Sequence, residues 1–351
     1  MAKSLIFYDI PGLASPSKAW SSNPFKARLV LNMKGIPYET VWVEYPDIAS
    51  LCKKINAEPT SFENDVPQYT LPILQDPNTG AVVSESFKIA RYLDETYPST
   101  IKAIPDGTEA FQEMFLAIFG EKMISPLIHT MILPTVRALT PRGAEYFRRT
   151  REKAFGRKLE EIAPEGAVWD EHWRGVLAGL SAIQSWIGAG KDGKERMFVM
   201  GDVPSFADVV LISHLVWLKI VGGVDSKAWK DLMEADGGRW KRLMERSEKW
   251  IWVDKPDVVT NPEGVIGTVY PAARVVFDWL GLDNNIGIYV RNPPENTGHC
   301  GVSAWHVMLQ DIQPFVLEEF GLTPHQHGEL HRYVTVPDPY GGVPVDHDGP
   351  A

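Results

Sequence analysis

Hydrophobic and polar positions along the first hundred residues change their period several times, and each change predicts a new element. The short apolar run Ser4–Tyr8 predicts a buried strand, and apolar positions at helical spacing after Phe25 predict a helix that ends at Gly35. Alternation over Glu39–Glu44 predicts a half-buried strand, and a short helix follows over 48–55. The chain therefore opens with strand, helix, strand and helix.

A hairpin and a further helix complete the predicted first domain. Residues 69–75 and 81–83 form two short apolar runs, and the segment Asp76–Gly80 between them contains the Pro, Asn and Gly of a tight turn. A helix is predicted from about 85 to 97, where Pro98 ends it. The pattern thus predicts an α/β domain over residues 1–100.

Strand signals disappear after a linker at Pro105–Gly107, and helical spacing continues for about 140 residues. The helices are predicted over 108–133, 141–162, 169–188, 205–221 and 226–249. We therefore expect an all-helical domain over 108–250. Residues 251–351 are rich in Pro, Gly, Asn and His, with helices predicted only near 265–280 and 303–320. This extension has no recognised fold.

Charge and cysteine content narrow the classes of partner. The 351 residues carry a formal net charge of −10 without a long basic run, so nucleic acid is not an expected partner. The apolar start is too short for a signal peptide, and no window approaches the ~20 apolar residues of a membrane span. Cys52 and Cys300 cannot form a disulfide framework. We expect a soluble cytoplasmic protein.

Three motifs mark positions where backbone groups or helix ends are specialised. In Tyr69–Gln75, Pro72 lies at the start of a predicted strand, where a proline cannot donate a hydrogen bond to the neighbouring strand. In Ser84-Glu85-Ser86, the start of a helix can bind an anion or be capped by its own side chains. In Gly201–Asp208, a serine and an aspartate three residues apart predict a capping box. Taken singly, each motif also fits an ordinary structural role.

Together with the order of elements, these motifs resemble the glutathione transferase fold over about 1–250. The resemblance implies a thioredoxin-like domain and a helical domain, glutathione as co-substrate, and a homodimer. It further implies a cis bond at Leu71–Pro72, with the backbone of Leu71 pairing with the cysteinyl part of glutathione. Glu85 would meet the γ-glutamyl ammonium and Ser86 the carboxylate.

The same resemblance places the group that activates the thiol between the first strand and the first helix. Ser21 is the expected donor to the glutathione sulfur, with Ser22 and Asn23 as alternatives. Ionising most of a thiol of pKa ~8.5 at neutral pH requires roughly 2.7 kcal/mol. A hydrogen bond to a charged acceptor contributes about 1.5 to 3 kcal/mol and a helix start roughly 0.3 to 1. The alternative is that these serines only cap the helix.

Four stretches are similar to the etherase-like transferases: Lys34–Tyr38, Trp42–Asp47, Ser86–Ala90 and Tyr146–Arg151. Members of that class use the glutathione thiolate to cleave β-aryl ethers or to conjugate aromatic electrophiles, and others bind aromatic ligands without turnover. The pocket for a hydrophobic electrophile is expected at the following positions: Tyr8, Phe115, Phe119 and Met123. An aromatic stripe at helical spacing is also typical of a helical core.

Histidines accumulate in the extension. His325, His327 and His331 have a spacing at which imidazoles can converge on a metal. Carboxylate and cysteine partners at ligand spacing are missing, so we favour an exposed polar segment and predict no metal site.

Overall fold

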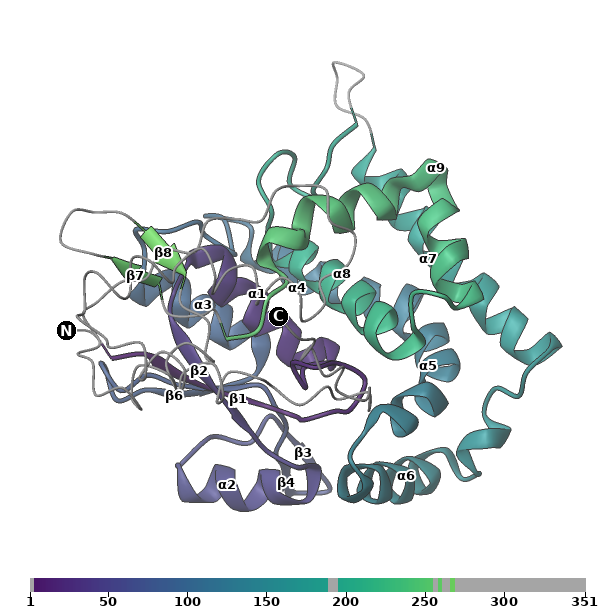
Figure 1. Cartoon of the computed structure of the whole chain (residues 1–351), viewed down its shortest axis with the longest axis horizontal. Helices are drawn as coiled ribbons and strands as arrows, with labels where there is room; N and C mark the ends of the chain where they lie inside the picture. The colour runs from purple at the N-terminus through teal and green to yellow at the C-terminus, as the bar shows by residue number, and fades with distance from the viewer. Residues whose placement is uncertain (1–2, 189–194, 255–257, 261–265, 269–351) are drawn as a thin grey trace, which may run out of the picture. The chain divides into compact units, whose positions relative to one another are not determined.

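A computed structural model describes residues 3–188, 195–254, 258–260 and 266–268 (Figure 1). The chain divides into two compact units, Met1–Lys255 and Pro256–Ala351. The first unit holds both predicted domains. This unit ends at Lys255, five residues past the predicted boundary at 250. The boundary itself stays a prediction.

A four-stranded sheet forms the centre of the first domain. Its strands are β1 (Leu5–Asp9), β2 (Tyr38–Trp42), β5 (Ile73–Gln75) and β6 (Val82–Ser84), in the order β2-β1-β5-β6. β1 runs parallel to β2 and antiparallel to β5, and β5 is antiparallel to β6. The helices are α1 (Ser22–Lys34), α2 (Ile48–Lys54) and α3 (Ser86–Thr96). This arrangement confirms the predicted thioredoxin-like α/β domain.

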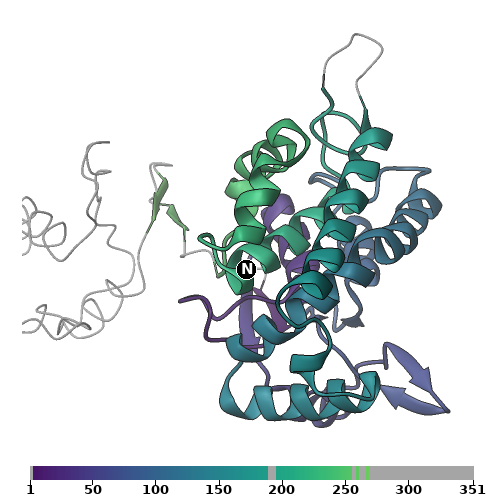
Figure 2. The same cartoon turned by 90° about the vertical axis from the view of Figure 1, so that its right-hand side faces the viewer.

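The turn between β5 and β6 forms as its residues predict. The N–H of Asp76 donates to the carbonyl of Ala81 at 2.8 Å, and Gly80 has a φ of 81°, a conformation that glycine adopts without steric cost. The sequence pattern did not predict a second hairpin, β3 (Ser61–Glu63) with β4 (Val66–Gln68), which projects from the molecule in Figure 2. Strands of three residues without a buried position leave no alternation to detect.

The second domain is helical, as predicted. Its α-helices are α4 (Glu109–Phe119), α5 (Ser125–Ala138), α6 (Pro141–Phe155), α7 (Ala167–Ile187), α8 (Phe206–Trp217) and α9 (Lys227–Ser247). All residues of α8 are buried, so this helix forms the core of the domain. α9 is bent at Ala235–Gly238, where the backbone leaves helical geometry, and the single helix predicted there is therefore interrupted.

The predicted capping box at the start of α8 is confirmed. The buried Asp208 carboxylate accepts hydrogen bonds from the Ser205 N–H at 2.8 Å and the Ser205 hydroxyl at 3.0 Å. It also accepts one from the N–H of Val199 at 2.8 Å. Asp208 thereby ties the loop before α8 to the core helix.

Two of the stretches that resemble the etherase-like class contact each other across the domain boundary. Tyr45 stacks on Tyr146 of α6, with ring centroids 5.9 Å apart. Asp47 forms an ion pair with Arg142, and the Thr140 hydroxyl donates to the Glu44 carboxylate at 2.7 Å. The segments Trp42–Asp47 and Tyr146–Arg151 therefore belong to the interface that fixes one domain against the other.

The second unit is described only at β7 (Val258–Thr260) and β8 (Ile266–Thr268), which pair in antiparallel fashion. The helix predicted over 265–280 is therefore wrong at 266–268, where Ile and Thr, residues of high β propensity, join a strand pair. The remainder of that helix, the helix predicted over 303–320 and the three histidines of the extension lie outside the described residues.

Candidate functional site

The sheet brings three predicted site segments to one end of the first domain. Tyr8, near the end of β1, lies opposite Ile73 at the start of β5. The loop after β1 leads to Ser21, Pro72 directly precedes β5, and Glu85 directly follows β6. The Glu85 N–H donates to the Pro72 carbonyl at 3.3 Å. Strand pairing therefore gathers residues that are far apart in the sequence.

Ser21 is the N-cap residue of α1, but its hydroxyl does not cap the helix. The backbone is extended there, with φ −76° and ψ 127°, and the Ser21 carbonyl accepts from the Phe25 N–H at 3.0 Å. Within the described chain, the hydroxyls of Ser21 and Ser22 form no hydrogen bond, although both residues are buried. Asn23 is exposed. The two serine hydroxyls at the helix start are thus available to a ligand.

The Leu71–Pro72 peptide bond is cis, as the resemblance implies. Leu71 is 3% exposed, yet its backbone N–H and C=O have no hydrogen-bond partner among the residues that the structure describes. Backbone groups of buried residues are nearly always paired. An unpaired donor and acceptor on one residue, next to a strand start, form an edge at which an extended peptide can bind.

Glu85 and Ser86 interact with each other at the start of α3. The Glu85 carboxylate accepts from the N–H groups of Phe87 and Lys88 at 3.0 and 3.1 Å, and the Ser86 hydroxyl donates to the same carboxylate at 3.1 Å. The structure is compatible with both roles predicted for this motif, helix capping and ligand binding. The carboxylate caps the helix, and a carboxylate with further lone pairs can still accept from an ammonium group.

Lys26 is a site residue that the sequence pattern did not identify. It lies on α1, the helix that packs against the buried helix α8, and it is half-buried. Burial lowers the pKa of Lys26, and the negative charge of Glu85 opposes that effect. Among the described residues the ammonium forms no hydrogen bond or ion pair. The sequence held no signal for it, because its environment comes from the burial of α1, in which every other position apart from Asn23 is buried.

The expected electrophile-pocket residues are all buried. The Tyr8 hydroxyl donates to Gln75 Oε1 at 2.8 Å, and burial raises the Tyr8 pKa. Phe115 stacks on Phe119, and Phe119 contacts His214 with ring centroids 5.0 Å apart. Met123 has no exposed surface. These contacts agree with the alternative that the stripe belongs to the core, and the pocket assignment stays a prediction.

No group of three or more His, Cys, Asp or Glu side chains suited to a metal ion occurs in the described part of the chain. The site offers instead hydroxyl groups, an unpaired backbone edge, a carboxylate and an ammonium. This set can bind a zwitterionic peptide and stabilise an anion at the start of α1.

Comparison with known proteins identifies the family of both domains. The model of the glutathione S-transferase N-terminal domain matches residues 20–96, and that of the C-terminal domain matches 110–250. The glutathione S-transferase-like protein ustS of Aspergillus flavus is 35% identical over 259 residues, which are 70% of this chain and 89% of that protein.

Solved structures indicate the same family. A glutathione S-transferase of Ceriporiopsis subvermispora in complex with glutathione is 46% identical, with a TM-score of 0.69, covering 72% of this chain and 99% of that one. A glutathione transferase of Phanerochaete chrysosporium is 41% identical, with a TM-score of 0.68, covering 72% and 100%. The chain belongs to the glutathione S-transferase family.

Proposed function

We propose that the protein is a glutathione transferase in which the Ser21 hydroxyl stabilises the thiolate of bound glutathione. The observation that carries this proposal is the unpaired hydroxyl of the N-cap residue at the start of α1, at the same end of the sheet as the unpaired backbone edge of Leu71. The cysteinyl part of glutathione pairs with Leu71, and its sulfur then accepts from Ser21. Helix α1 adds the favourable potential of its N-terminus.

The γ-glutamyl group of glutathione binds at the start of α3 in this proposal. Its ammonium meets the Glu85 carboxylate and its carboxylate meets Ser86. Placing a second carboxylate beside Glu85 would leave a net negative charge, because one ammonium cannot neutralise two carboxylates. Lys26, whose charge interacts with Glu85, supplies the missing positive charge. These three residues thus match the ammonium and the carboxylate of the γ-glutamyl group.

The thiolate attacks a hydrophobic aromatic electrophile, either by conjugation or by cleavage of a β-aryl ether. Support for the etherase-like choice comes from Trp42–Asp47 and Tyr146–Arg151, which resemble that class and form the domain interface. A second candidate is a carrier that binds aromatic ligands without turnover. Product formation separates the two, since a carrier retains the aromatic compound unchanged.

Replacement of Ser21 by Ala tests the mechanism. Loss of one hydrogen bond to a charged acceptor is expected to raise the pKa of the bound thiol by about 1 to 2 units and to lower kcat about 10- to 100-fold at pH 7. The ultraviolet absorbance of the thiolate in the complex with glutathione, measured against pH, reports the pKa directly. Ser22→Ala is the matched control and should titrate as wild type.

The reverse result, with Ser22→Ala shifted and Ser21→Ala unchanged, would assign the role to Ser22. If the double variant still carries a thiolate at neutral pH, neither serine stabilises it and the mechanism is wrong.

A further inference from the structure

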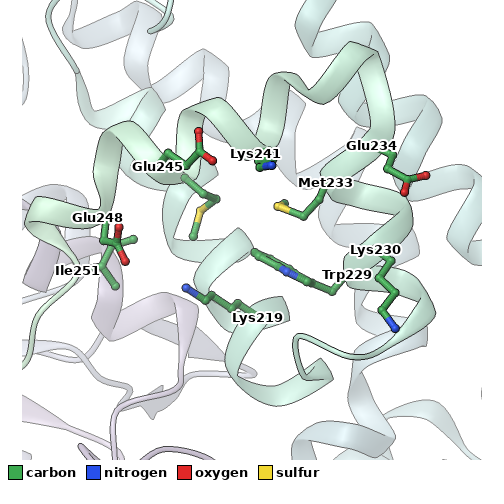
Figure 3. Close-up of a pocket in the computed structure, with 10 residues that line it drawn as sticks. Lys219, Trp229, Lys230, Met233, Glu234, Lys241, Glu245, Glu248 and Ile251 are labelled. Carbon is green, nitrogen blue, oxygen red and sulfur yellow. The ribbon is translucent and has the colours of Figure 1, made fainter. Parts of the chain in front are cut away.

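The lining of the groove at the bend of α9 carries no net charge. The groove has a volume of about 650 Å³, and Figure 3 shows side chains of both signs around it. Three lysines balance three glutamates, namely Lys219, Lys230, Lys241, Glu234, Glu245 and Glu248. None of the buried side-chain atoms that lack a hydrogen-bond partner in the described chain belongs to this lining. One such atom lies instead beside the proposed glutathione site, at Trp20, directly before Ser21.

The loop between β1 and α1 crosses the domain boundary, and we call residues 10–20 of this loop the strap. Gly12 pairs with Leu139 in an isolated antiparallel bridge, and the Leu13 N–H donates to the Ala138 carbonyl at 2.7 Å. Ala138 is the last residue of α5. The strap therefore joins the first domain to the helical domain directly before the start of α1.

Gly12 allows this close contact because it has no side chain. A Cβ atom at this position would collide with Cδ1 of Trp20, and it would lie 2.9 Å from Nε1 of Trp20 and 3.1 Å from the Ala138 oxygen. Only glycine fits without a shift of the strap or of the indole ring. Trp20 is 3% exposed, so the closed strap buries this ring next to Ser21.

Closure of the strap is opposed at Trp20. The indole nitrogen of Trp20 is buried and donates to no acceptor in the described part of the chain. An indole nitrogen can only donate, and burial without a partner removes the hydrogen bond that water would provide. Leu13 adds little to closure, because its side chain is 67% exposed in the closed strap. The closed state thus combines a hydrogen bond across the boundary with an unpaired donor, and opening relieves the second.

We propose that the strap is a gate that opens to admit the electrophile to the start of α1 and to release the product. Opening returns the Trp20 N–H to water and exposes the segment directly before Ser21, which holds the thiolate in the proposed function. The role in the reaction therefore rests on that function. The opening itself depends only on the contacts of Gly12, Leu13 and Trp20.

Hydrogen exchange of the Leu13 amide, followed by NMR in the full-length protein without glutathione, measures the opening. Gly12→Ala should speed this exchange at least about tenfold, because the added Cβ displaces the strap from Trp20. Trp20→Phe deletes the unpaired donor and should slow the exchange at least about fivefold, because closure then leaves no polar group unpaired there. Ala14→Ser is the matched control, since it adds one atom at an exposed position of the strap and should exchange within about twofold of wild type.

Dissociation of S-(2,4-dinitrophenyl)glutathione, a conjugate with an aromatic ring, measures the role as a gate. Its rate constant in stopped-flow experiments should rise in Gly12→Ala and fall in Trp20→Phe. Exchange of the Leu13 amide at the wild-type rate in Gly12→Ala would overturn the opening, and faster exchange without faster dissociation would overturn the gate. Gly12→Ala decides alone if Trp20→Phe does not fold. Neither measurement uses the thiolate, so a failure of the Ser21 mechanism is recognised separately.

Discussion

Lys26 is the residue at which the charge balance of the proposed glutathione site can be tested. Replacing it by Met removes one positive charge beside Glu85 while keeping the length of the side chain. We expect the KM for glutathione to rise about two- to fivefold with kcat nearly unchanged, because a partly solvated ion pair contributes about 0.2 to 1 kcal/mol to binding. Steady-state kinetics at varied glutathione measure both parameters.

A glutathione analogue provides the control for Lys26. γ-Aminobutyryl-cysteinylglycine lacks the γ-glutamyl carboxylate, so Lys26→Met should not change its KM. An equal loss with both peptides would show that Lys26 acts on the fold of the site rather than on that carboxylate.

His214 should make the protein less stable as the pH falls. Burial, with a smaller effect of the Lys26 charge, lowers its pKa to about 3, so it stays neutral in the folded chain. The unfolded chain takes up a proton near pH 6.5, and this favours unfolding at lower pH. His214→Gln should remove that dependence. Urea denaturation at pH 7, 6 and 5 should show wild type losing up to about 1.4 kcal/mol per pH unit relative to the variant below pH 6.

Asp208 has the opposite effect to His214 on how the free energy of unfolding changes with pH. The effect of His214 is therefore measured as the difference between wild type and the His214 variant. Burial raises the pKa of Asp208 to about 6, so the folded chain keeps a proton that the unfolded chain releases near pH 4. Its contribution to stability is present below about pH 4 and is lost as the pH rises through 6. Asp208 is unchanged in His214→Gln. Parallel pH profiles for wild type and variant would contradict the assignment to His214.

For single residues, sequence analysis found those whose residue type and position indicate their chemistry. A serine at a helix start, a proline at a strand mouth and a Glu-Ser pair can be located without coordinates. Lys26 and His214 could not, because their properties come from burial between α1 and α8 and not from their neighbours in the sequence. For the same reason the sequence alone could not decide whether Phe115 and Phe119 line a pocket or fill the core.

Among the elements, the end of the first compact unit has a structural role that composition did not reveal. The Asn32 side chain on α1 donates to the carbonyls of Trp250 and Trp252 at 2.6 and 2.9 Å. Trp252 stacks on Tyr38 with ring centroids 5.8 Å apart, and the Thr40 hydroxyl donates to Asp254 at 2.5 Å. The segment after the last helix therefore binds back to α1 and β2 of the first domain.

Two truncated chains measure this contribution. A chain that ends at Lys255 keeps the Trp252 and Asp254 contacts described above and is the reference. A chain that ends at Trp250 loses the Trp252 and Asp254 contacts. Its Tm should fall by about 4 to 8 °C, since a hydrogen bond and an aromatic pair each contribute about 1 kcal/mol. Equal melting of the two truncated chains would assign no stabilising role to these residues.

Element types followed from periodicity where an element is long or has one buried face. The four sheet strands, the helices of the second domain and the Asp76–Gly80 turn are such cases. The exposed hairpin β3–β4 has no buried face, and the bend in α9 depends on left-handed backbone at Asp236 and two glycines. Neither feature changes the hydrophobic pattern, so neither could be predicted from it.

On the scale of the whole molecule, the run Glu109–Ala138 has the length and composition of a membrane-spanning helix. The core helix of a soluble domain passes the same test, and Phe115, Phe119 and Met123 of this run are buried in the helical domain. Apolar side chains are also exposed on α4, namely Phe111 at 43%, Met114 at 61% and Ile118 at 39%. Their spacing places them on one face of the helix. A second copy of the chain is the partner we propose for this face.

Met114→Glu tests the homodimer on that face. In a twofold-symmetric interface the new carboxylate meets its own copy, and like charges brought together at an interface cost several kcal/mol. We expect the dissociation constant of the dimer to rise at least about 100-fold, so that light scattering at micromolar concentration reports a monomer for the variant and a dimer for wild type. Met200→Glu changes a methionine that is 40% exposed elsewhere and should remain dimeric. A wild-type monomer, or a Met114→Glu dimer as tight as wild type, would exclude α4 as the interface.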